Sequence, residues 1–186
     1  AAHAILPPTD PKSPIYKFNV PATCGHCHSE LDKTFMQSIH GQAIVRGNQL
    51  APVCTDCHGI HSIKSPSDPN SPVSDKNVSR DVCARCHEGV RLSQEFGVPG
   101  GRVTSYFDSY HGLASQGGSL VVANCSSCHG VHNILPSSNP RSTVNRANLE
   151  ATCGKCHQGA TRQFTLTPVH MGDGLYPKDI GSIAVR

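Results

Sequence analysis

The feature that most constrains this chain is a short pattern, C-x-x-C-H, which occurs five times in 186 residues. All ten cysteines belong to it, and a histidine directly follows every pair. The cysteine pairs are Cys24 and Cys27, Cys54 and Cys57, Cys83 and Cys86, Cys125 and Cys128, and Cys153 and Cys156. The histidines are His28, His58, His87, His129 and His157.

C-x-x-C-H is the attachment signature of c-type haem. Two thiols three positions apart lie on one face of a helical turn, where they can form thioethers to the two vinyl groups of one porphyrin. The next histidine is then held under the iron as its proximal ligand. The sequence therefore predicts five covalently bound haem c groups.

Two other uses of paired cysteines fit less well. Zinc sites also use C-x-x-C, but a tetrahedral site takes two pairs, so five pairs leave one over and the histidines have no role. A thioredoxin-like C-x-x-C needs a βαβ setting, which the sequence does not show.

Composition predicts a thin conventional core. Hydrophobic residues make up 37% of the chain, there is no Trp, and 17 Gly and 14 Pro favour turns. We expect a mostly irregular chain with short α-helices and little or no β-sheet, wrapped around a contiguous row of haems. No basic stripe suits nucleic acid, and no apolar run approaches the ~20 residues of a membrane span.

The chain also repeats. Residues 38–63 match residues 109–134, and the segment from His3 reads against that from His132. We predict one pentahaem domain, 1–186, built of tandem two-haem repeats: a partial repeat at 3–58, a full one at 61–129 and a partial one at 132–170.

Six further histidines recur at equivalent places in this repeat and are candidate second axial ligands: His3, His40, His61, His111, His132 and His170. Constant offsets run forward to the next motif. They favour His3 for the haem of Cys24, His40 for Cys54, His61 for Cys83, His111 for Cys125 and His132 for Cys153. His170 is then spare, and no iron is necessarily open. Such bis-histidine iron suits outer-sphere electron transfer at low potential.

Local patterns predict a few elements. Apolar residues every four positions indicate a helix over 29–40, with Ser29 as its cap and Gly41 at its end. Short helices should lead into the motifs at 77–87 and 147–157. The stretches 5–14, 64–72 and 135–141 are predicted loops, and no strand hairpin is evident.

The phrasing S-x-H-G, C-x-x-C-H-G-x-H-x-I and C-G-K-C-H, spread over residues 3–170, resembles the small multihaem c-type cytochromes of anaerobic and metal-respiring bacteria. That group includes soluble periplasmic pentahaem donors, haem domains tethered to membrane quinol oxidases, and cytochromes that polymerise into extracellular wires. Multihaem nitrite reductases carry C-x-x-C-K at the catalytic haem, and that pattern is absent here.

The resemblance and the ligand count predict an electron carrier that is not an enzyme. The small residues of the opening AAHA are typical of a mature end left by signal cleavage, and covalent haem implies assembly outside the cytoplasm, so we expect a periplasmic or extracellular location. Expected partners are redox proteins or extracellular electron acceptors, with ordered termini that could join copies into a conductive filament. A multihaem reductase with one open iron is the alternative.

Overall fold

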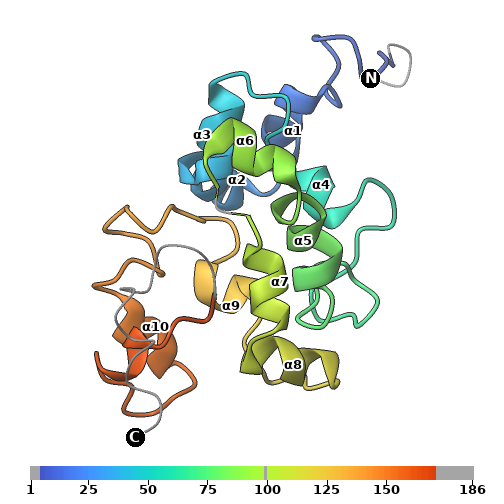
Figure 1. The fold of residues 1–186 in the computed structure, drawn as a ribbon. Helices are drawn as coiled ribbons and strands as arrows, with labels where there is room; N and C mark the ends of the chain where they lie inside the picture. Colours follow the sequence, from blue (N-terminus) through green and yellow to red (C-terminus); the bar gives the residue numbers. More distant parts are fainter. Residues whose placement is uncertain (1–4, 99, 171–186) are drawn as a thin grey trace, which may run out of the picture.

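Short helices joined by long irregular segments make up the fold (Figure 1). The structure, a computed structural model, describes residues 5–98 and 100–170. The helices are η1 Lys17–Asn19, α1 Val20–Gly25, α2 Ser29–Gln37, α3 Ile39–Val45, α4 Cys54–His58, η2 Val78–Cys83, α5 Ala84–His87, α6 Val90–Phe96, α7 Arg102–Phe107, α8 Tyr110–Gln116, α9 Cys125–His129, α10 Leu149–Gly154 and η3 Phe164–Leu166. The described residues form no strand. The predicted helical, irregular fold class is therefore confirmed.

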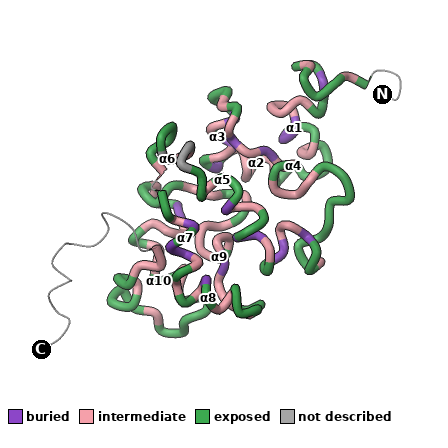
Figure 2. The backbone as a smooth tube through the Cα atoms, turned by 45° about the vertical axis from the view of Figure 1, so that its right-hand side comes forward, coloured by how far each residue is buried: buried purple, intermediate pink, exposed green. Residues whose placement is uncertain are grey.

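The core is small. Val20, Ile44, Ala51 and Val53 pack together near the N-terminal helices. Elsewhere buried residues are few and scattered, as Figure 2 shows. Several large apolar side chains stay exposed, Val121 at 91% among them. Side-chain burial alone gives this chain little stabilisation, as its composition predicts.

The helix predicted over 29–40 is wrong in its limits, because the chain breaks at Ser38. Ser38 is extended (φ −72°, ψ 166°), and its Oγ accepts a hydrogen bond from the Gly41 N–H at 3.1 Å. It thereby caps a second helix, α3, which contains Gly41. Ser29 is the first helical residue of α2 and makes no capping bond. Serine competes for backbone donors and so favours the cap over the helix interior.

The predicted helices leading into the motifs at 77–87 and 147–157 are confirmed as η2 with α5 and as α10. One detail explains a mismatch in the repeat. Cys83 follows its preceding repeat histidine by one residue more than Cys153 does. The π-helix η2 accommodates the extra residue in one wide turn, as π-bulges do.

The three predicted loops are confirmed as non-helical, but they are ordered by a repeated set of hydrogen bonds. In the second copy, the buried Ser71 Oγ donates to the Lys64 carbonyl at 3.3 Å. The Asn77 Nδ2 donates to the carbonyls of Pro69 and Ser71, both at 2.9 Å. The same bonds recur at Ser13 with Asn19 and at Ser142 with Asn148. The sequence signal is [D/N]-P-x-S-x5-N, which sequence reasoning missed.

Hydrogen bonds between distant segments join the two halves. The Ile39 N–H donates to the Ile134 carbonyl at 2.8 Å. The Cys125 N–H donates to the Ser79 Oγ at 3.1 Å, which fixes the start of α9 against η2. In Figure 1, α1 to α4 gather at one end of the molecule and α8 to α10 at the other, with α5 and α7 between them. Across the described residues, no helix has the length and apolar character to cross a membrane.

Candidate metal centres

Each C-x-x-C-H histidine lies at the end of a short helical turn. His58, His87 and His129 are the last residues of α4, α5 and α9. His28 and His157 follow α1 and α10, and their N–H groups donate to the carbonyls of Cys24 and Cys153, both at 2.9 Å. The turn geometry predicted for the motifs is therefore present in all five.

Four of these histidines lie opposite a second imidazole. The ring centroids are 6.1 Å apart for His40 and His87, 6.1 Å for His58 and His132, 6.0 Å for His111 and His157, and 6.2 Å for His129 and His170. Every pair joins one motif histidine to one of the six repeat histidines. The structure thus brings together two ligand classes that the sequence distinguished.

This spacing suits two nitrogen ligands on opposite sides of one metal atom. A metal–nitrogen bond of about 2 Å, with the ring centre about 1 Å behind the nitrogen, puts the two ring centres about 6 Å apart. A zinc site would instead need four ligands in a tetrahedron. Over the described part of the chain, no group of three or more His, Cys, Asp or Glu is arranged to hold a metal ion. The imidazole pairs therefore fit the two axial positions of haem iron.

The forward pairing predicted for His40 and His111 is wrong. His40 lies at His87 instead of at the motif of Cys54, and His111 lies at His157. For His40 the reason lies in the core. The chain after α3 turns back so that Val53 packs with Val20, which brings α4 to α1 and leaves His40 to face α5.

The assignments of His132 and His170 also need correction. His132 stacks on His58 rather than serving the motif of Cys153. His170, predicted to be spare, lies at His129.

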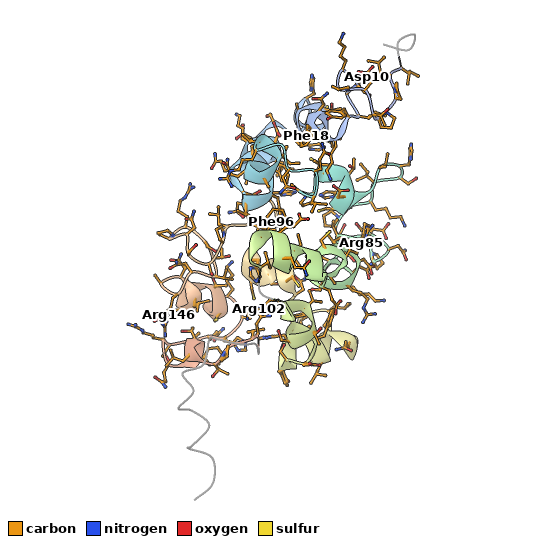
Figure 3. All side chains as sticks on the ribbon, turned by 45° about the horizontal axis from the view of Figure 1, so that its top comes forward. Asp10, Phe18, Arg85, Phe96, Arg102 and Arg146 are labelled. Carbon is orange, nitrogen blue, oxygen red and sulfur yellow. The ribbon has the colours of Figure 1, made fainter. Side chains whose placement is uncertain are left out.

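Hydrogen bonds to α7 fix the ring of His170. Its Nδ1 is 2.8 Å from the carbonyl of Arg102, which Figure 3 labels at the start of α7, and 3.3 Å from the Ser105 Oγ. Because a carbonyl only accepts, Nδ1 carries the proton and the Nε2 lone pair is free for a metal.

Four histidines are not among these described pairs. No described ring lies opposite His28, whose side chain is exposed. His61 is exposed and makes no ring contact within the described chain. His3 lies outside the described residues. His26, inside the first motif, is exposed, with its Nδ1 2.8 Å from the Ala22 carbonyl.

Burial favours the neutral, metal-binding form of seven of the paired imidazoles. Burial, and then the charge of His87, lowers the pKa of His40 from 6.5 to about 4. Burial is also the largest cause that lowers the pKa of six others, namely His58, His87, His111, His129, His132 and His170. These rings are neutral at pH 7, and only a neutral imidazole has a free lone pair.

Thiols of successive motifs are neighbours. Burial, followed by the Cys24 thiol beside it, raises the pKa of Cys54 to about 12. A hydrogen bond with the Cys125 thiol, ahead of burial, raises the pKa of Cys83. The linked neighbours are Cys24 with Cys54, Cys57 with Cys86, Cys83 with Cys125, and Cys128 with Cys153. The five motifs therefore follow one another in space in their chain order.

Comparison with known proteins gives one relative. The chain is 26% identical over 145 residues to the cytochrome c-type protein NrfB of Escherichia coli O6:H1. The match covers 75% of this chain and 66% of the relative, which is just under two thirds of its length. No family model matches the chain, and neither does any solved structure. Over three quarters of its length, the chain is therefore similar to a c-type cytochrome.

Proposed function

We propose that this chain is a multihaem c-type cytochrome that transfers electrons through five haem c groups. The observation that carries the proposal is the set of four imidazole pairs at 6.0–6.2 Å, each built on a C-x-x-C-H histidine. The likeness to a cytochrome c-type protein supports it. The ten motif cysteines hold the porphyrins, and the motif histidines are the proximal ligands.

Electron transfer follows from how the chain would hold the irons. An iron with an imidazole on each side has no position for substrate, and the haem itself supplies one-electron chemistry when bound. The chain's own residues orient the two rings and space the motifs. Two imidazoles per iron, without methionine, favour low reduction potentials.

We infer a contiguous row from the neighbouring thiols. Because thioether bonds hold each porphyrin at its own cysteines, motifs whose thiols are neighbours would keep consecutive haems close. First cysteines are neighbours between motifs one and two and between three and four, second cysteines between two and three, and a second and a first cysteine between four and five. This unbroken series of neighbouring motifs supports a single domain.

Within the described residues no imidazole lies opposite His28, and His3, the ligand predicted for this motif, lies outside them. His61 is an exposed donor whose repeat equivalent, His132, is paired with His58. We propose that His61 of one copy supplies the second ligand at the His28 motif of another copy, which would extend the row into a filament.

Covalent haem attachment supports a location outside the cytoplasm, in the periplasm or at the cell exterior. The proposed partners are redox proteins or extracellular electron acceptors. The termini that were expected to join copies, residues 1–4 and 171–186, lie outside the described residues.

A second function, a reductase with one open iron, has one observation in its favour. His28 is exposed and has no described imidazole opposite it. If no histidine reached this iron, a small ligand could bind there.

A haem count with a ligand-binding test decides between these functions. The purified protein should carry five haems by intact mass and pyridine haemochrome absorbance, and acid-acetone should extract none. The oxidised protein should be low-spin at four irons or more. Fewer covalent haems, or high-spin iron at several motifs, would contradict the proposal. Turnover of a small oxyanion at an iron that also binds carbon monoxide would favour the reductase.

A further inference from the structure

The tetrapeptide S-x-H-G occurs twice, at residues 38–41 and 109–112, and the two copies fold alike. In each, the serine is the N-cap of a seven-residue helix, α3 or α8. The histidine takes the second helical position and the glycine the third. Both histidines belong to the paired set, His40 with His87 and His111 with His157.

The serine side chain caps the first turn of the helix, which is the turn that contains the histidine. The Ser109 Oγ accepts a hydrogen bond from the Gly112 N–H at 3.2 Å and donates one to the Tyr106 carbonyl at 2.6 Å. Its backbone is extended, at φ −75° and ψ 164°. Ser38 makes the same bond to Gly41 and is 1% exposed. The Ser109 side chain therefore joins the start of α8 to the end of α7.

The glycine lets that preceding helix approach. A Cβ at Gly112 would overlap the Tyr106 carbonyl oxygen and the Phe107 Cα. A Cβ at Gly41 would overlap the Phe35 carbonyl oxygen and lie 2.5 Å from the Met36 Cα. Those neighbours are backbone atoms, so they cannot move aside as a flexible side chain could. Any larger residue would push the first turn, and the histidine in it, away from its place.

We propose that the serine and glycine of S-x-H-G are positioning residues that aim His40 and His111 at their irons. This inference rests on the proposed function, because it concerns how two of its ligands are held. Serine fixes the rotation of the first turn, and glycine fixes its distance from the preceding helix. A ligand held in place before metal binds loses less freedom on binding, which strengthens the bond.

The repeat histidines of the other two pairs are held by different contacts, so S-x-H-G should position only His40 and His111. His170 has no S-x-H-G and is fixed by its Nδ1 bond to the Arg102 carbonyl. His132 follows α9 in a loop. Changes in the S-x-H-G serine or glycine should therefore affect only the irons at His87 and His157.

The test uses the haem-loaded protein with Ser109→Ala, Ser109→Thr and Gly112→Ala. The readouts are electron paramagnetic resonance of the oxidised form and the rate of cyanide binding, which requires the second imidazole to leave. A His111→Ala variant identifies the signal of the iron at His157. We expect Ser109→Ala to speed cyanide binding at that iron about fivefold, as loss of an N-cap implies. Thr keeps the hydroxyl and should restore the original rate, while Gly112→Ala should turn that signal high-spin.

Gly117→Ala is the matched control. It lies at the end of the same helix, and its added Cβ would meet only carbonyl oxygens at 3.4 and 3.5 Å. It should leave all five signals unchanged. The inference is overturned if Ser109→Ala, with unchanged helical circular dichroism, binds cyanide at the original rate, or if the signal that changes differs from that of His111→Ala. A starting protein without low-spin haem would overturn the proposed function as well, so the two failures are distinguishable.

Discussion

The imidazoles of His58 and His132 stack almost parallel, with 11° between their planes and 6.1 Å between their centroids. The two residues are 74 positions apart, with His58 at the end of the first partial repeat and His132 at the start of the last one. The stacking also assigns His132 to the second motif, that of Cys54, which comes earlier in the chain. The repeat units therefore interlock, because every pair joins histidines of two different units.

Replacement of His132 by alanine should open the iron at the Cys54 motif. We expect one of the low-spin signals to turn high-spin and one reduced haem to bind carbon monoxide, because a single axial ligand is lost. A protein with Cys54→Ala and Cys57→Ala, which cannot attach that haem, identifies the signal. If His132→Ala instead changed the signal tied to Cys153 and Cys156, the arrangement described here would be wrong.

His170→Ala should act in the same way on the iron at the Cys125 motif. His170 and His129 are 6.2 Å apart, so loss of the first leaves the second as the sole axial ligand of that iron. Electron paramagnetic resonance of the oxidised protein should show one new high-spin species. The control is His26→Ala, which removes an exposed ring whose Nδ1 lies 2.8 Å from the Ala22 carbonyl and should change no signal.

Sequence reasoning predicted the ligand types but not their partners, for a physical reason. Offsets along the chain identified His40 and His132 as members of a repeat, because a repeat is a local property of sequence. Which iron each one faces depends on how α3 and α9 pack against distant parts of the chain. That packing is set by many individual long-range contacts, such as the hydrogen bond from the Ile39 N–H to the Ile134 carbonyl. An interlocked array cannot be inferred from spacing alone.

The loops show a different limit. Composition marked residues 64–72 as irregular, and they are, but their order comes from two polar side chains whose role composition does not reveal. Ser71 is fully buried and Asn77 binds two carbonyls of the same turn. Aligning the three copies of the pattern would have found both residues, since the serine and asparagine recur at fixed positions from the proline.

Asn77→Ala should destabilise the folded chain. Loss of one exposed and one partly buried hydrogen bond leaves the carbonyls of Pro69 and Ser71 with weaker partners, at a cost of about 2 kcal/mol. That loss should lower the melting midpoint of the haem-loaded protein by roughly 4–8 °C. The measurement is a thermal scan by circular dichroism. Asn70→Ala, an exposed change in the same loop, is the control and should shift the midpoint by less than about 2 °C.

Acid should release the second imidazoles only well below the usual titration range of histidine. The pKa of His40 is lowered by burial to about 4, against 6.5 for a free ring. Because burial favours the neutral ring, the His40 imidazole stays unprotonated and able to bind iron as pH falls through 6.5. An iron bound to it would oppose its protonation further. Absorbance during a slow acid titration should show the iron at His87 low-spin down to about pH 4. A midpoint near 6.5 would mean that His40 is not held as described.

The iron at His28 gives the sharpest test of polymerisation. If His61 of another copy supplies its second ligand, dilution should free that position, so carbon monoxide binding to one reduced haem should increase as protein concentration falls. His61→Ala should make that haem bind carbon monoxide at every concentration and should abolish assemblies seen by negative staining and light scattering. His111→Ala is a matched control, because it opens a different iron and should leave assembly intact. A haem at Cys24 that stays closed at any dilution, and opens only in His3→Ala, would instead show that the chain completes its own array, and the case for a filament through His61 would end.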